Sequence, residues 1–81
     1  EVPRSIERLT AALDEENTAL YTTLVHGLKN NARGIGADHA ADICYTAEQT
    51  ARSGDIGKLR KLHSDVCEAV RAAAEAAVCH Q

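Results

Sequence analysis

Apolar residues recur at intervals of three and four along most of this chain, with polar residues between them. That spacing places the apolar side chains on one side of an α-helix, and no stretch alternates as a strand does. Short polar or glycine-containing segments divide the pattern and predict helices at about residues 3–15, 18–33, 37–52 and 56–78. Four amphipathic helices with short connections predict an all-α fold, an antiparallel up-down-up-down four-helix bundle, as a single domain over residues 1–81.

The expected helix ends carry residues that favour starts and stops. Asn17 or Thr18 can accept a backbone N–H at the start of the second helix, and Asp55 can do so at the start of the fourth. Gly34 and Gly36 follow the last apolar turn of the second helix, where glycine commonly ends helices. Each connection therefore has a local chemical reason, which supports the division into four helices.

The second predicted helix has two contrasting sides. Its apolar side carries Leu20, Tyr21, Leu24, Val25, Leu28, Ala32 and Ile35. Its opposite side carries Thr22, His26, Lys29 and Arg33, with Asn30 beside them. A neutral imidazole is a nucleophile near neutral pH, and cations on the same face can offset the charge of a phosphoryl group that it receives. We therefore interpret His26 as a candidate phosphoacceptor, with Lys29 and Arg33 as electrostatic support.

The same residues carry a family resemblance. Segment 26–30, His-Gly-Leu-Lys-Asn, and segment 34–37, Gly-Ile-Gly-Ala, resemble the His-x-Leu-Lys-Gly…Gly-Ala signature of histidine phosphotransfer (HPt) domains. The likeness continues through Ala47-Glu48 and segment 53–55 and covers about residues 20–70. Asn30 departs from the commonest pattern, in which glycine or another small residue follows the lysine.

The resemblance implies a phosphorelay intermediate. His26 would accept a phosphoryl group through Nε2 from the aspartate of a response-regulator receiver domain and pass it to, or back to, a receiver. Lys29 would be the motif lysine, and a polar residue near Glu48 would lie close to the histidine. The surface that docks the receiver would include Thr22, Val25, Gly27 and Asn30.

Two interpretations of Glu48 remain open. It flanks the stripe of small residues in the third predicted helix. It can hydrogen-bond and orient the imidazole of His26, or it can be a solvated residue on the flank of its helix.

No glycine-rich nucleotide loop is present, so we expect a phosphotransfer intermediate without an ATP site of its own, rather than an enzyme. We expect no cofactor on this chain, with Mg²⁺ supplied by the receiver. Because the chain starts at Glu1 rather than at methionine, we interpret it as a piece of a larger signalling protein, tethered to a hybrid histidine kinase. A closed bundle can bury its core alone, so we expect a monomer.

Composition and charge disfavour several other classes of protein. The formal net charge is −3, and only two residues are aromatic, which disfavours nucleic-acid binding. No apolar run approaches the roughly 20 residues that cross a bilayer, so we expect no membrane contact. Three cysteines, Cys44, Cys67 and Cys79, form no CxxC pair, which indicates reduced thiols and a cytoplasmic protein.

Two rival functions follow from other features. One is a helical bundle that has the HPt shape and binds partners without accepting phosphate; the departure at Asn30 is the hint for it. The other is a metal- or cofactor-binding bundle that uses His63, Cys67 or Cys44, since His63 and Cys67 are four residues apart on one helix. Two ligands are too few for a structural zinc site, so we expect no metal.

Overall fold

The chain is all-α, as predicted. The structure is a computed structural model that describes the backbone of residues 2–79 and the side chains of residues 4–75. Its helices are α1 (Val2–Asp14), α2 (Thr18–Gly34), α3 (Asp38–Arg52) and α4 (Ile56–Cys79). Each end lies within one residue of its predicted position.

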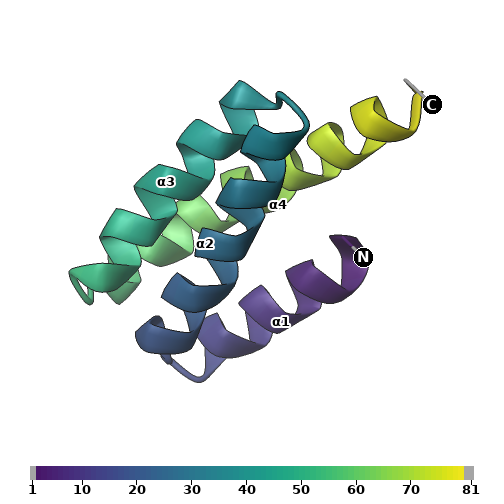
Figure 1. The fold of residues 1–81 in the computed structure, drawn as a ribbon. Coiled ribbons are helices and arrows are strands. Elements are labelled where there is room, and N and C mark those ends of the chain that lie inside the picture. The colour runs from purple at the N-terminus through teal and green to yellow at the C-terminus, as the bar shows by residue number, and fades with distance from the viewer. Residues whose placement is uncertain (1, 80–81) are drawn as a thin grey trace.

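The helices form an antiparallel bundle about 37 Å long (Figure 1). The most extensive contact is between α2 and α3, and α4 packs against α3. The first helix contacts α2 and α4, so it covers the side of α2 that faces away from α3. One side of α2 is therefore buried by the bundle, while its edge beside α3 reaches the surface. No helix in the described part of the chain is both long and apolar enough to cross a membrane.

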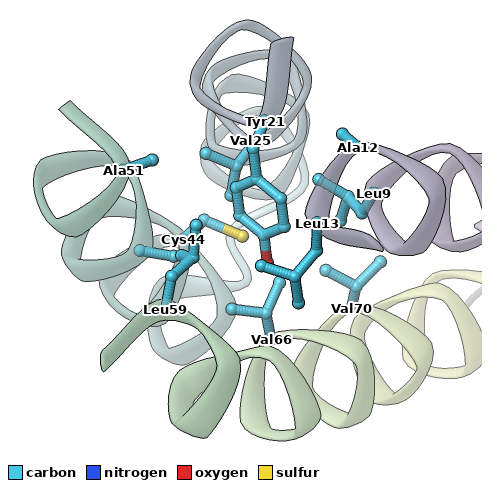
Figure 2. Packing of buried hydrophobic residues seen from close by; sticks show 11 residues of the cluster. Leu9, Ala12, Leu13, Tyr21, Val25, Cys44, Ala51, Leu59, Val66 and Val70 are labelled. Atoms are coloured by element: carbon cyan, nitrogen blue, oxygen red, sulfur yellow. The ribbon is translucent and has the colours of Figure 1, made fainter. Parts of the chain in front are cut away.

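The main core is aliphatic around one aromatic ring. Tyr21 is fully buried at its centre and is its largest side chain (Figure 2). The side chains around it are Leu9, Ala12, Leu13, Val25, Cys44, Ala47, Ala51, Leu59, Val66 and Val70. Because the sequence contains no Phe, Trp or Met, this tyrosine fills the volume that one of those residues takes in other cores.

The hydroxyl of Tyr21 is satisfied by a half-buried histidine on α4. Tyr21 Oη lies 2.9 Å from Nδ1 of His63, and Thr10 Oγ1 lies 3.0 Å from Nε2 of the same ring. Thr10 donates its own hydrogen to the carbonyl of Ile6, at 2.9 Å, so it accepts from Nε2–H. The other nitrogen, Nδ1, then accepts from the Tyr21 hydroxyl. His63 thus links α1, α2 and α4 as a neutral ring.

The connections contain the expected caps. Asn17 Oδ1 accepts from the backbone N–H of Leu20 at 3.1 Å, and Asp55 Oδ1 accepts from that of Lys58 at 3.0 Å. Gly36 has a φ of +76°, a left-handed conformation that glycine adopts without strain. These contacts confirm Asn17 and Asp55 as the residues that start α2 and α4.

Candidate functional site

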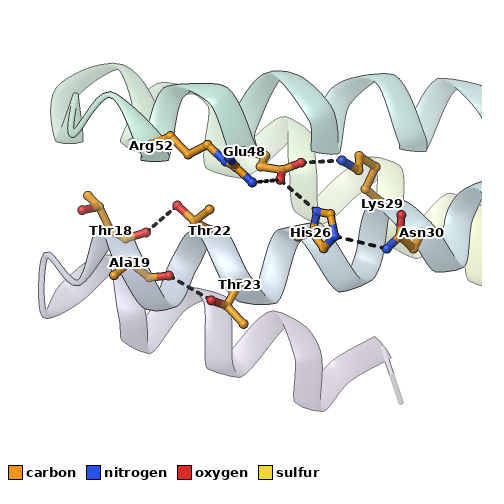
Figure 3. Close-up of polar contacts among 9 residues, drawn as sticks. All are labelled: Thr18, Ala19, Thr22, Thr23, His26, Lys29, Asn30, Glu48 and Arg52. Carbon is orange, nitrogen blue, oxygen red and sulfur yellow. Dashed lines mark hydrogen bonds and ion pairs between the residues drawn. The ribbon is translucent and has the colours of Figure 1, made fainter.

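The candidate nucleophile lies where α2 runs beside α3. The side chain of His26 is 48% exposed, and its Nδ1 lies 2.9 Å from Oε2 of Glu48, whose side chain is 2% exposed (Figure 3). One edge of the imidazole is thus fixed from inside the protein, while the rest of the ring remains accessible.

Glu48 is held by two cations as well as by the histidine. Lys29 Nζ donates to Oε1 at 2.6 Å, and Arg52 Nη2 donates to Oε2 at 2.9 Å. The hydrogen bond from Lys29 is the largest cause that lowers the pKa of Glu48, from 4.5 to about 2; burial opposes it, and the bonds from His26 and Arg52 add to it. Glu48 is therefore a carboxylate at neutral pH.

This charge state determines the proton arrangement on His26. An ionised carboxylate can only accept hydrogen bonds, so Nδ1 of His26 must carry the hydrogen that lies toward Glu48. In the neutral ring, the lone pair is then on Nε2. Asn30 Nδ2 lies 3.3 Å from Nε2 and can donate to that lone pair. The nitrogen with a lone pair that could act as a nucleophile is thus Nε2, not the nitrogen that contacts Glu48.

The site carries a net positive charge. Lys29 and Arg52 supply two positive charges, and Glu48 supplies one negative charge. With a neutral imidazole, one positive charge is left over next to the candidate nucleophile. A dianionic phosphoryl group is therefore electrostatically favoured here.

Lys29 does not lie where the helical spacing placed it. We predicted it on the outer side of α2 with His26, but it is buried, with 7% of its surface exposed. Its ammonium is 5.6 Å from the centroid of the Tyr45 ring, and it reaches Glu48 on α3. A long flexible stem lets a lysine at the edge of a helix turn inward to a buried carboxylate. The prediction of an outward-facing Lys29 was wrong.

Arg33, the other predicted cation, stays outside this network. It is exposed, and among the described residues its guanidinium makes no hydrogen bond or ion pair. The second cation at the site is Arg52, which the sequence analysis did not single out. Its position four residues after Glu48 was the available signal, because residues at that spacing meet on a helix surface.

The predicted docking residues divide into surface and core. Gly27 and Asn30 are exposed, and Thr22 is half-buried. Val25 is fully buried in the main core, so its inclusion in a docking surface was wrong. Its position on the apolar side of α2 leaves it between the helices. Tyr45 on α3, 48% exposed beside Lys29, was not predicted as part of this region.

The structure distinguishes between the two interpretations of Glu48. Its burial contradicts the interpretation as a solvated flank residue. The imidazole contact has the geometry of a hydrogen bond, 2.9 Å between heavy atoms.

Two of the candidate metal ligands, His63 and Cys67, are engaged in other contacts. Both ring nitrogens of His63 are hydrogen-bonded in the core, and Cys67 Sγ lies 3.5 Å from its Nε2. Cys44 is buried, and burial raises the pKa of its thiol to about 11. No group of three or more potential ligands occurs among the described residues, and the side chain of Cys79 lies outside them.

Comparison with known proteins identifies the family of this chain. The family model of the Hpt domain matches residues 1–78. No curated protein and no solved structure showed a significant match. Hpt domains are histidine phosphotransfer modules of phosphorelays, and they have no ATP site of their own. With almost the whole chain covered by the family model, this protein belongs to the Hpt domain family.

Proposed function

We propose that this chain is a phosphorelay intermediate whose phosphorylated atom is Nε2 of His26. It accepts the phosphoryl group from the aspartyl phosphate of a receiver domain and passes it to a second receiver or back to the first. The observation that carries the proposal is the Nδ1–H contact with buried Glu48, because it leaves the lone pair on the accessible Nε2.

The transfer step needs little covalent chemistry from this chain. The Nε2 lone pair forms the N–P bond as the P–O bond of the aspartyl phosphate breaks, and the electron pair of that bond leaves on the aspartate carboxylate. The Nδ1 hydrogen stays in place, so the phosphorylated ring gains positive charge. Glu48 stabilises that charge from 2.9 Å away. The remaining requirements are in-line approach and charge stabilisation.

The two cations that contact Glu48, one buried and one exposed, contribute electrostatically. Lys29 and Arg52 hold Glu48 and leave a positive potential for the incoming phosphoryl group. Mg²⁺ belongs to the receiver in this proposal, and the chain itself uses no cofactor. Arg33 is exposed on α2 and makes no contact with Glu48, so in this proposal it acts on the phosphoryl group at longer range.

The receiver docks on the exposed surface around His26. That surface includes Gly27, Asn30 and the half-buried Thr22 on α2, and the exposed ring of Tyr45 on α3. We further propose a cytoplasmic monomer tethered to a hybrid histidine kinase, because a module without an ATP site depends on a kinase and receivers for its phosphate.

The test is transfer of label from a phosphorylated receiver to three proteins: wild type, His26→Gln and His39→Gln. His39 is an exposed histidine at the start of α3 and serves as the matched control. We expect label on wild type and on His39→Gln, none on His26→Gln, and loss of that label in acid but not in alkali. Receivers that bind the folded wild type without labelling it would contradict the proposal and indicate an interaction module instead.

A further inference from the structure

Nε2 of His26 already has a hydrogen-bond donor beside it. Asn30, one turn further along α2, places Nδ2 3.3 Å from Nε2 (Figure 3). The proton arrangement imposed by Glu48 leaves a lone pair on Nε2, which makes the amide the donor. Both residues are exposed, so this hydrogen bond lies on the surface that a phosphoryl donor would approach.

No other described side chain donates to this nitrogen. Lys29 and Arg52 both direct their hydrogens at Glu48, which lies at the opposite edge of the ring. Arg33 makes no hydrogen bond with the imidazole. The cations therefore act on a phosphoryl group through their charge, while Asn30 is the group positioned to contact it.

We propose that Asn30 is a phosphoryl-contact residue that transfers its hydrogen bond from Nε2 to a phosphoryl oxygen when His26 is phosphorylated. This inference rests on the proposed function. Before transfer, the amide donates to the lone pair and favours the ring form with hydrogen on Nδ1. Formation of the N–P bond uses that lone pair, and the released amide N–H then donates to an oxygen attached to the same nitrogen through phosphorus.

The exchange favours the phosphorylated state. A hydrogen bond to a charged oxygen is stronger than one to a neutral nitrogen, by roughly 1 kcal/mol net, or about five-fold in an equilibrium constant. Glycine, which follows the lysine in the commonest family pattern, has no side chain that could make this bond. The effect would therefore be a property of this chain rather than of the family signature.

The experiment uses phosphoramidate, a small-molecule phosphoryl donor, so that no receiver is needed. Wild type, Asn30→Leu, Asn30→Gly and Asn31→Gly are phosphorylated, and hydrolysis of phosphohistidine is followed by ³¹P NMR, with His26→Gln identifying signals from other histidines. Asn31→Gly is the matched control, since it makes the same change one residue further along the exposed part of α2. The ¹⁵N shift of Nε2 in each unphosphorylated protein reports the hydrogen bond directly.

We expect phosphohistidine to hydrolyse faster in both Asn30 variants, by up to about five-fold, the limit reached when the hydrogen bond is wholly lost in the transition state. We also expect the Nε2 shift to change in both, and neither quantity to change in Asn31→Gly. If phosphohistidine in Asn30→Leu had the same half-life as in wild type, the inference would be overturned, because leucine fills the same space without donating a hydrogen bond. Failure of phosphoramidate to label His26 would also overturn it. Labelling by phosphoramidate but by no receiver would contradict the proposed relay alone, so the two failures are distinguishable.

Discussion

Glu48 fixes both the position of the His26 ring and the ring nitrogen that carries hydrogen. A buried carboxylate without partners would be costly, and this one accepts from three side chains on two helices. Because its oxygens can only accept, the same contacts that keep it charged also fix which imidazole nitrogen carries hydrogen. Stability and reactivity are therefore coupled at this residue.

Glu48→Gln tests that coupling. The glutamine amide can donate to Nδ1, which would move the ring hydrogen to Nε2 and block the nucleophile. We expect phosphoryl acceptance to fall about 10- to 100-fold. This is the range, roughly 10- to 100-fold, for the loss of metal affinity or activity when the group that orients a metal-ligating histidine is removed. We also expect a loss of about 3 kcal/mol in the free energy of unfolding, measured with urea, because the buried ammonium of Lys29 loses its counter-charge.

The matched control is Glu68→Gln, which removes an exposed carboxylate on α4. It should leave both measurements within a few tenths of a kcal/mol or two-fold of wild type. A folded Glu48→Gln protein that accepts phosphate at the wild-type rate would show that the carboxylate does not orient the ring.

His63 makes stability depend on pH. Burial lowers the pKa of its ring, and the charge of Asp14 opposes this in part. Near pH 6.5 the unfolded chain therefore binds a proton at His63 that the folded protein does not. The contribution of the neutral His63 ring to the free energy of unfolding is complete above pH 6.5 and is lost as the pH falls below it. We expect the free energy of unfolding to decrease between pH 7 and 5, by at most about 1.4 kcal/mol per pH unit for one proton.

The measurement is urea unfolding of wild type and His63→Gln across that range. Glutamine retains a donor and an acceptor but does not titrate, so its profile should be flatter. The lowered pKa of Glu48 acts at lower pH, between about 4.5 and 2, and does not interfere. A wild-type stability that stays constant from pH 7 to 5 would contradict the neutral, hydrogen-bonded ring.

At the scale of the helices, α2 buries one side in the core and exposes His26 at its edge beside α3. Its spacing was enough to predict that His26 is accessible and that Tyr21 is buried. It did not predict that Lys29 turns inward, because periodicity locates a Cα and not the end of a four-carbon side chain. Arg52 was missed for a related reason: its role depends on Glu48 being buried against α2, which is a property of two helices together.

Gly27→Ala separates helix stability from docking. Gly27 lies within α2 beside His26, and a Cβ there would meet no atom within 4 Å. We expect alanine to raise the free energy of unfolding by about 0.5–1 kcal/mol, since glycine is unfavourable inside a helix. We expect it to weaken receiver binding, measured by calorimetry, because it adds a methyl group to the proposed docking surface.

Gly34→Ala is the control at the end of the same helix, where an added Cβ also meets nothing within 4 Å. It lies eight residues from His26, or roughly 12 Å along the helix. Its receiver affinity should match that of wild type. Equal weakening by both substitutions would show that the docking surface is not centred on His26.

At the scale of the whole molecule, the bundle could be predicted because each helix is specified by residues close together in the sequence. Each helix has its own apolar side, and α2 and α4 begin at capping residues that the structure confirms, Asn17 and Asp55. The meeting of His26 with Glu48, 22 residues apart in sequence, depends on how α2 packs along α3. The family resemblance suggested that contact, but spacing alone left it open.

The most direct test of the account is to locate the phosphorus atom. Protein with ¹⁵N-labelled histidine would be phosphorylated by a receiver aspartyl phosphate, and coupling between ³¹P and the ring nitrogens would be read by NMR. The account predicts coupling to Nε2 of His26, with hydrogen retained on Nδ1 toward Glu48. Phosphorus on Nδ1 of His26, or on another histidine, would contradict it.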